Sequence, residues 1–268
     1  MSAFYFISSF CVAFFILIPL SLKWEIELKY AFLGVAVFGG ISGFVLSIIV
    51  SKNNLSLPLT ILIEAAVVIF LTSITIFFSF QRDPERAAPA KGRNIIVSPA
   101  DGKIIYVKRV KNGELPLSEK KGKRIKLEEF LKLDYLKSGE AYQVGIVMNF
   151  LDVHVTRAPV AGFIKCVMPI PGKFLSLKKE ESILKNERLT TLIQNERMEV
   201  AVVHIASRLV RRIVPFIRES QKVNLGERIG IIKFGSQVDI LIPVIEELKT
   251  AVRPGDRVIA GVSIIAEY

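Results

Sequence analysis

The segment LPLTILIEAAVVIFLTSITIFFSFQRDPER, residues 57–86, divides the chain into two parts of different composition. Residues 57–80 carry a single charge, Glu64, and are long enough for a helix to cross the hydrocarbon core of a membrane. The charged end that follows contains Pro84, and because proline disfavours helical geometry at the residue before it, we expect the helix to end near Asp83. An apolar helix with such a stop predicts a membrane anchor joined to a second domain.

Two further apolar runs, residues 3–22 and 31–50, precede this segment, and each is about one membrane-crossing helix long. Residues 1–80 hold three basic and three acidic side chains, so the net charge of +11 lies entirely in residues 81–268. We therefore expect residues 1–80 to be a membrane anchor of two or three transmembrane helices, two if the first run lies in the interface. Basic residues after the third run predict that this end faces the cytoplasm from the cell membrane; they are Arg82, Arg86, Lys91 and Arg93.

The composition excludes several classes of protein. An apolar fraction of 51% rules out a disordered chain. The chain has two cysteines, Cys11 and Cys166, far apart in different contexts, and two histidines, His154 and His204. These are too few ligands at unsuitable spacing for a zinc centre, and no disulfide is expected. We therefore expect no metal.

The excess of basic residues in the second part has three interpretations. A nucleic-acid surface would usually add aromatic stacking platforms or a known module, and the sequence has neither, so no nucleic-acid partner is expected. An anionic membrane surface attracts each basic residue held near it by about 1 kcal/mol. A solvated basic face without a partner is the third interpretation. The membrane surface needs the fewest assumptions for a domain that directly follows membrane helices.

From Asn94 onward, short β-branched runs alternate with Gly, Pro, Asn and Asp, which predicts a mostly-β (α+β) soluble domain of antiparallel sandwich or barrel type over residues 81–268. The β runs are residues 94–97, 103–110, 143–148, 160–168, 200–205, 229–234, 238–242 and 257–265. Residues 127–136 and 178–193 are compatible with short helices or ordered loops, and residues 244–252 with one or two helical turns.

Two candidate site residues lie next to β runs. Asp101 belongs to Ser98-Pro-Ala-Asp-Gly102, where Pro-x-Asp-Gly is good turn chemistry, and its alternative task is to accept a hydrogen bond from an imidazole. His154 shares a polar strand face with Asp152 and Thr156, so a functional and a structural role are both open. His204 lies among apolar residues and fits a structural role.

Gly235-Ser236 interrupts two β runs. On local sequence, a bulge or tight turn accounts for the pair. The alternative is that Ser236 Oγ attacks the carbonyl of Gly235, because a residue without a Cβ tolerates the strained backbone that this needs. Such an attack requires a base, for which His154 oriented by Asp101 is the natural candidate.

Six motifs now occur in order along the second part. They are Arg82-Asp83-Pro84-x-Arg86, Ser98-Pro99-Ala100-Asp101-Gly102, Asp152-Val153-His154-Val155-x-Arg157-x-Pro159, Asn186-Glu187-Arg188, Arg211-Arg212-Ile213 and Ile232-x-Phe234-Gly235-Ser236. Together they resemble the phosphatidylserine decarboxylase family, in particular its short, archaeal-type branch. The resemblance covers essentially residues 80–268, and it does not extend to the number of helices in the anchor.

The resemblance implies a zymogen that cleaves itself between Gly235 and Ser236. The β chain, residues 1–235, and the α chain, residues 236–268, would form a heterodimer, and Ser236 would become a covalent pyruvoyl group, with no pyridoxal phosphate. His154 would be the base, oriented by Asp101. The pyruvoyl group would serve as the electron sink for decarboxylating a membrane lipid, phosphatidylserine or archaetidylserine, to its ethanolamine counterpart.

The arginines are candidates for binding the substrate. Arg157 stands where many longer-branch relatives have a second histidine, so His154 serves two steps or another group takes one of them. Arg157 is a candidate for the substrate carboxylate or phosphate, and Arg82 and Arg86 are candidates for the lipid phosphate. A homo-oligomer is also compatible with the sequence.

Two other classes of function use the same residues. A membrane-anchored Ser-His-Asp hydrolase would keep the chain intact, but Ser236 lacks the Gly-x-Ser-x-Gly elbow of the common lipase architecture. A non-enzymatic, membrane-anchored lipid-binding β module would need none of this chemistry.

Overall fold

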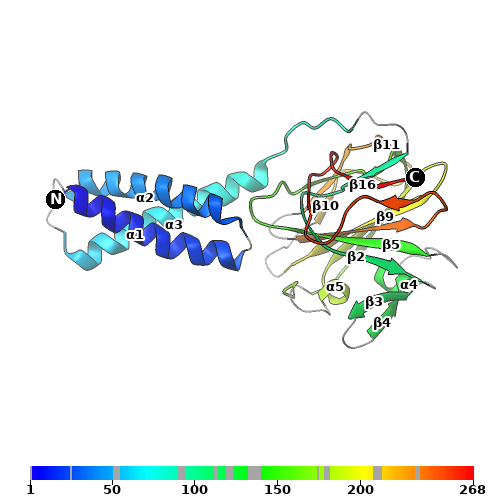
Figure 1. The fold of residues 1–268 in the computed structure, drawn as a ribbon, viewed down its shortest axis with the longest axis horizontal. Helices are drawn as coiled ribbons and strands as arrows, with labels where there is room; N and C mark the ends of the chain where they lie inside the picture. The colour runs from blue at the N-terminus through cyan, green and yellow to red at the C-terminus, as the bar shows by residue number, and fades with distance from the viewer. Residues whose placement is uncertain are drawn as a thin grey trace. The chain divides into compact units, whose positions relative to one another are not determined.

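Each of the three apolar runs forms one helix: α1 (Ser2–Lys23), α2 (Leu28–Val50) and α3 (Leu57–Gln81) (Figure 1). In the described part of the chain, these three helices are long and apolar enough to cross a membrane. This confirms the expected N-terminal helices of membrane length. The structure is a computed structural model, and it describes residues 2–24, 26–50, 55–89, 94–111, 114–118, 123–131, 140–173, 175–177, 182–207, 213–232 and 236–268.

The chain forms two compact units. One contains Met1–Gln81 together with Asn149–Leu151, and the other contains Arg82–Met148 together with Asp152–Tyr268. The three-residue segment Asn149–Leu151 therefore belongs to the unit of the helices, although the sequence on both sides of it belongs to the β unit.

Glycines allow α1 and α2 to approach closely. A Cβ on Gly39 would lie 2.7 Å from the ring of Phe10, and one on Gly43 would lie 2.8 Å from the ring of Phe6. Gly40, on another side of the same helix, has nothing within 4 Å of that position. Small residues four apart are a common way for membrane helices to pack backbone against backbone.

A buried carboxyl group ties α3 to α1. Glu64 is fully buried, and its Oε1 accepts hydrogen bonds from Ser9 Oγ at 2.9 Å and from Ser8 Oγ. Polar groups inside a membrane segment are costly unless they face other helices and find partners there. The one charge in the third apolar run is therefore accounted for by contacts between helices.

The second unit is built on a curled, half-barrel antiparallel sheet. Among the described residues it has eight strands in the order β11-β7-β8-β9-β13-β5-β2-β15. Figure 1 labels β2, β5, β9 and β11 of this sheet. Their bounds are β2 Gly102–Val110, β5 Ala141–Met148, β7 Gly162–Ile170, β8 Arg188–Gln194, β9 Glu199–Ala206, β11 Lys222–Val223, β13 Ser236–Pro243 and β15 Arg257–Val258. The antiparallel β domain that the sequence predicts is therefore confirmed.

Strand β13 lies in the middle of this sheet with both faces buried. Val238 and Ile240 belong to the larger hydrophobic cluster, whereas Leu241 belongs to a second one with Val203 and Ile205 of β9. Because successive residues of a strand point to opposite faces, the odd-numbered positions of β13 lie on the side of the second cluster.

Smaller sheets complete the unit. β6 (Val155–Arg157) pairs with β12 (Arg228–Ile232), which pairs with β10 (Ile213–Pro215). The others join β1 (Ile95–Val97), β16 (Ile264–Glu267) and β14 (Lys249–Thr250), and β3 (Glu114–Ser118) with β4 (Lys123–Lys126). The described helices here are α4 (Leu127–Leu131) and α5 (Ser182–Lys185).

Two local expectations are wrong. Within residues 178–193, a short helix is confirmed at Ser182–Lys185, but residues 188–193 belong to strand β8. All positions of this strand except the last are buried between two neighbouring strands, and no alternation marks it in the sequence. Residues 244–252 contain turns and the short strand β14 instead of helical turns. For residues 127–136, a short helix is confirmed as far as Leu131, and residues 132–136 lie outside the described part.

Candidate active site

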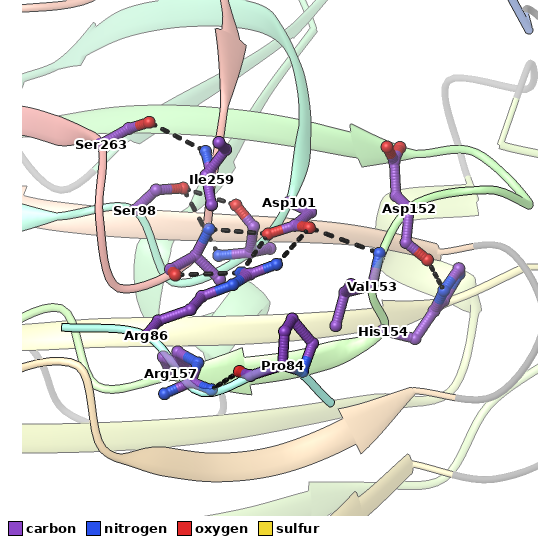
Figure 2. Close-up of polar contacts among 12 residues, drawn as sticks. Pro84, Arg86, Ser98, Asp101, Asp152, Val153, His154, Arg157, Ile259 and Ser263 are labelled. Carbon is purple, nitrogen blue, oxygen red and sulfur yellow. Dashed lines mark hydrogen bonds and ion pairs between the residues drawn. The ribbon is translucent and has the colours of Figure 1, made fainter. Parts of the chain in front are cut away.

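Hydrogen bonds and ion pairs hold the charged segment after α3 against the β domain. Asp83 Oδ2 accepts a bond from Arg228 Nε at 2.6 Å, and Glu85 Oε1 accepts one from Arg228 Nη2 at 2.6 Å. The carbonyl of Pro84 accepts a bond from Arg157 Nη2 at 2.8 Å (Figure 2). Sequence reasoning missed Asp83, Glu85 and Arg228, although the two acids lie inside the first of the six motifs and were the available signal.

Asp101 is the centre of a dense polar cluster (Figure 2). Arg86 grips its carboxylate with two bonds, Nη1–Oδ1 at 2.5 Å and Nη2–Oδ2 at 2.8 Å. The backbone N–H of Ala260 donates to Oδ1 at 2.7 Å, and that of Val153 donates to Oδ2 at 3.4 Å. Arg86 Nη1 also donates to the carbonyl of Ala260 at 3.0 Å. Asp101 therefore joins the post-helix segment, the C-terminal segment and the strand entry next to His154.

The turn that carries Asp101 is fixed on both sides. Ser98 Oγ donates to the carbonyl of Ala100 at 2.6 Å, and the Arg157 N–H donates to the carbonyl of Pro99 at 2.8 Å. Gly102 has a φ of 146°, and a Cβ there would lie 2.2 Å from the carbonyl oxygen of Val147. Only glycine fits this close approach, so the turn presses directly against β5.

His154 is fully buried, and its Nδ1 lies 2.8 Å from the carbonyl oxygen of Asp152. A carbonyl can only accept, so the proton of the neutral ring belongs on Nδ1 and the lone pair on Nε2. Burial, and to a smaller extent the charge of Arg82, lower the pKa of His154 to about 4, although the Asp152 carbonyl and the charge of Asp101 act in the opposite direction. His154 is therefore a neutral imidazole at pH 7, with Nε2 able to accept a proton.

Asp101 acts on His154 indirectly in the described contacts. Its Oδ2 holds the N–H of Val153, the residue before the histidine, and its charge raises the histidine pKa. The oxygen facing the imidazole Nδ1 is the backbone carbonyl of Asp152, whose own carboxylate binds Arg257 at 2.6 Å. That Asp101 orients His154 stays a prediction, with the backbone at Val153 as its physical route.

The proposed cleavage site consists of Gly235 and Ser236, and the structure describes only the second of them. Gly235 lies outside the described residues, and Ser236 is the first residue of β13, in register with Met148 and Ala206. The N–H of Ile232 donates to the carbonyl of His154 at 3.1 Å. Ser236 is four positions after Ile232 along the chain, and four residue steps span at most about 14 Å. The chain thus brings Ser236 into the neighbourhood of His154.

The three candidate arginines have different environments. Arg157 is almost fully buried and donates to the carbonyls of Gly226 at 2.9 Å and Pro84 at 2.8 Å, and burial lowers its pKa. Arg86 is held by Asp101 as described. Arg82 lies close enough to His154 for its charge to lower the histidine pKa. Their substrate-binding roles stay predictions.

His204 is a second buried histidine. Its Nε2 lies 2.9 Å from Thr156 Oγ1, and its Nδ1 lies 3.4 Å from the carbonyl of Leu189. Burial lowers its pKa to about 4. These partners are all structural groups of neighbouring strands. Across the described residues, no group of three or more His, Cys, Asp or Glu side chains is placed to hold a metal ion.

The β domain that follows the helices of membrane length thus holds a buried neutral imidazole, His154, and an ion-paired carboxylate, Asp101. A family model described as phosphatidylserine decarboxylase matches residues 74–266. The chain therefore belongs to the phosphatidylserine decarboxylase family, whose members are carboxy-lyases, and the resemblance carried by the six motifs is confirmed.

Individual relatives agree with this assignment. A protein of Methanocaldococcus jannaschii that carries the provisional name of an archaetidylserine decarboxylase proenzyme is 42% identical over 187 residues, which cover 70% of this chain and 87% of that protein. A phosphatidylserine decarboxylase proenzyme of Novosphingobium aromaticivorans is 36% identical and covers 70% of this chain and 71% of its own length. One of Desulfotalea psychrophila is 34% identical and covers 76% and 85%.

Proposed function

We propose that this chain is a membrane-anchored proenzyme that cleaves itself between Gly235 and Ser236 and then decarboxylates a serine phospholipid. The observation that carries the proposal is the state and place of His154: it is fully buried and neutral at pH 7 with its proton on Nδ1, and its carbonyl accepts a hydrogen bond from Ile232, four positions before Ser236. The names of the relatives, which are proenzymes of this reaction type, support it.

Self-cleavage needs a base and a serine at a strained junction. Ser236 Oγ loses its proton to His154 and attacks the carbonyl carbon of Gly235, so an ester C–O bond forms and the peptide C–N bond breaks. Loss of the Ser236 α-proton then expels the Gly235 carboxylate, which leaves dehydroalanine at the head of the second chain. Water converts this group to a pyruvoyl group and ammonia. The products are a β chain of residues 1–235 and an α chain of residues 236–268, which stay together as a heterodimer because β13 is paired on both sides.

The residues present fit a pyruvoyl group at position 236. The group supplies a carbonyl that captures the substrate amine and an electron sink for the carbanion left by departing carbon dioxide. A ketone at a chain start needs a dry, fixed setting, and β13 lies between β5 and β9 with fully buried residues along it. His154 then has a second task, to hold or deliver the proton at the former α-carbon. Because it is neutral at rest, it must first take a proton from the processing step or from the incoming ammonium.

The lipid is assigned by chemistry and by setting. Residues 1–80 anchor the protein in the cell membrane, and residues 81–268 form the catalytic domain, which faces the cytoplasm and its anionic leaflet. We assign the lipid phosphate to Arg82, because it directly follows the end of α3, a helix of membrane length, and a guanidinium binds phosphate oxygens with charge-assisted bonds. Phosphatidylserine and archaetidylserine share the headgroup that this site would recognise.

Denaturing mass spectrometry of the purified chain tests the proposal. We expect two chains divided between residues 235 and 236, the smaller without a free amino group, and carbon dioxide release from vesicles containing phosphatidylserine or archaetidylserine. Ser236→Ala should give one intact chain without activity, whereas Ser73→Ala, on an exposed side of α3, should be cleaved normally. A single unmodified chain that is active would overturn the proposal; esterase activity in that chain would indicate the hydrolase, and lipid binding without turnover the binding module.

A further inference from the structure

A buried polar cluster lies on strand β13 immediately after Ser236, and neither the family motifs nor the proposed reaction uses it. It consists of Tyr106, Gln143, Gln237 and Asp239, called here the Asp239 cluster. Asp239 is fully buried, and the two glutamines are nearly so. A buried carboxylate is costly unless it is well paired, so its place three residues from the cleavage junction requires an explanation.

The contacts of the cluster form a closed set. Asp239 Oδ2 accepts hydrogen bonds from Tyr106 Oη at 2.7 Å and from Gln143 Nε2, and Oδ1 accepts one from Gln237 Nε2 at 2.7 Å. Gln237 Nε2 also donates to Tyr106 Oη at 2.6 Å. Three strands, β2, β5 and β13, are thereby joined by side chains as well as by their backbone ladders.

The sheet is shaped to allow these contacts. Tyr106, Gly145 and Asp239 stand opposite one another in register on β2, β5 and β13. A Cβ on Gly145 would lie 2.4 Å from the ring of Tyr106. The glycine on the middle strand therefore lets the tyrosine ring pass over β5 and reach the carboxylate on β13. Any other residue at position 145 would push the ring away.

We propose that the Asp239 cluster is a positioning site that fixes residue 236 and the start of β13, first for self-cleavage and then, as the head of the α chain, for decarboxylation. This inference rests on the proposed function. Before cleavage, residue 236 is held from both directions along the chain. After cleavage, only the part of β13 that follows it holds it, and Gln237 and Asp239 are the first two odd-numbered positions of that part. Their bonds to β2 and β5 oppose fraying of the new chain end, which would displace its reactive carbonyl from His154.

The charge of Asp239 makes the cluster sensitive to pH. Burial raises the pKa of Asp239 to about 6, while its three hydrogen bonds and the charge of Lys108 act in the opposite direction. Tyr106 and Lys108 are the titratable groups that β2 contributes, with the Lys108 ammonium 4.8 Å from the tyrosine ring centre, and β5 and β9 contribute Gln143 and Val203, which do not titrate. Above pH 6, the carboxylate accepts from all three donors. Below it, the carboxyl carries its own proton and one donor contact is lost.

The test follows newly made full-length chain in lipid vesicles, with self-cleavage as the first readout. Tyr106→Phe keeps the ring over Gly145 and removes only the hydroxyl, and Gln237→Leu removes the amide. We expect both to slow self-cleavage about 10- to 100-fold, as a misplacement of about 1 Å does, and to lower kcat per pyruvoyl group with KM unchanged. Ile193→Val, a buried truncation on β8 away from the cluster, is the matched control and should behave as wild type.

The pH dependence provides a second readout. Wild-type self-cleavage should slow as the pH falls through about 6, and Asp239→Asn should be slow with no inflection there. If Ile193→Val slowed self-cleavage equally, the effect would be a general loss of stability and the inference would be overturned. Wild-type rates in Tyr106→Phe and Gln237→Leu would overturn it as well. A wild-type chain that never cleaves contradicts the proposed function instead, so the two failures are distinguishable.

Discussion

The guanidinium of Arg86 and the carboxylate of Asp101 face each other in a two-bond pair, with 10% and 12% of their side chains exposed. Arg86 lies five residues after the end of α3, so the pair joins the segment that follows this helix to the turn that carries Asp101. Breaking such a buried pair lowers the stability of the fold, because the remaining partner is left as an unpaired buried charge.

Removing Arg86 should therefore destabilise the β domain strongly. Arg86→Ala leaves Asp101 with its two backbone donors alone, and we expect a loss of about 3–5 kcal/mol and a drop of about 10 °C in the thermal midpoint of the solubilised protein. Arg253→Ala breaks an exposed pair with Asp256 and should cost at most about 1 kcal/mol. Equal effects of the two substitutions would show that the Arg86 pair is as weak as a surface pair.

Charges around His154 should move its pKa in opposite directions. In the uncleaved Ser236→Ala chain with labelled histidine, NMR titration should find His154 neutral at pH 7 with a pKa of about 4. Arg82→Met removes a positive charge and should raise that pKa, whereas Asp101→Asn removes a negative one and should lower it. His204 is the internal control, because neither group acts on it. A His154 resonance that titrates near 6.5 would contradict its burial.

Much of the fold is predictable because its signals are local. The three apolar runs decide the helices by length alone, and β13 shows its strand character in a run of β-branched residues. Strand β8 is not recognisable in the sequence, because Thr190 and Thr191 are both buried, one on each face, and the polar–apolar alternation of a half-exposed strand is missing. A strand buried on both faces has no period that distinguishes it from a short buried helix.

The site is predictable only as far as its residues lie in turns and motifs. Asp101 is identified by turn chemistry, but its partner Arg86 lies 15 positions earlier and the other contacts come from residues far along the chain. The Asp239 cluster is not predictable from the sequence at all. Its existence depends on Gly145 standing between Tyr106 and Asp239 on three adjacent strands, and that register is a property of the assembled sheet.

The α1–α2 contact offers a matched pair of glycine substitutions. Gly39→Ala places a methyl group 2.7 Å from the Phe10 ring and 3.2 Å from the Phe10 Cα, so backbone must move as well as the ring. Overpacking of this kind costs about 1–3 kcal/mol. Gly40→Ala meets nothing within 4 Å and should be neutral or slightly stabilising, because alanine is the better helix former. Thermal unfolding in detergent, followed by helical circular dichroism, should show the first variant melting earlier and the second not.

Lowering the pH should destabilise the β domain through its two buried histidines, and Asp239 should partly offset this loss of stability. His154 and His204 have folded pKa values of about 4. As the pH falls from about 6.5, the unfolded chain takes up protons that the folded chain refuses, which costs about 3 kcal/mol per histidine. Asp239 acts oppositely, since its folded pKa of about 6 lies above the ordinary 3.8, and the penalty of burying its charge is relieved as the pH falls through 6.

Asp239→Asn removes that relief, so its free energy of unfolding should fall more steeply than that of wild type between pH 6 and pH 4. The difference in slope is the informative quantity, because it is independent of how much the substitution changes stability at pH 7. Urea unfolding of the Ser236→Ala chain and of its Asp239→Asn derivative, measured at pH 7, 6, 5 and 4, provides both curves without the complication of cleavage. Parallel curves would mean that Asp239 has the same proton affinity in the folded and unfolded chain, and its burial beside Tyr106 and Gln143 would then carry no electrostatic cost.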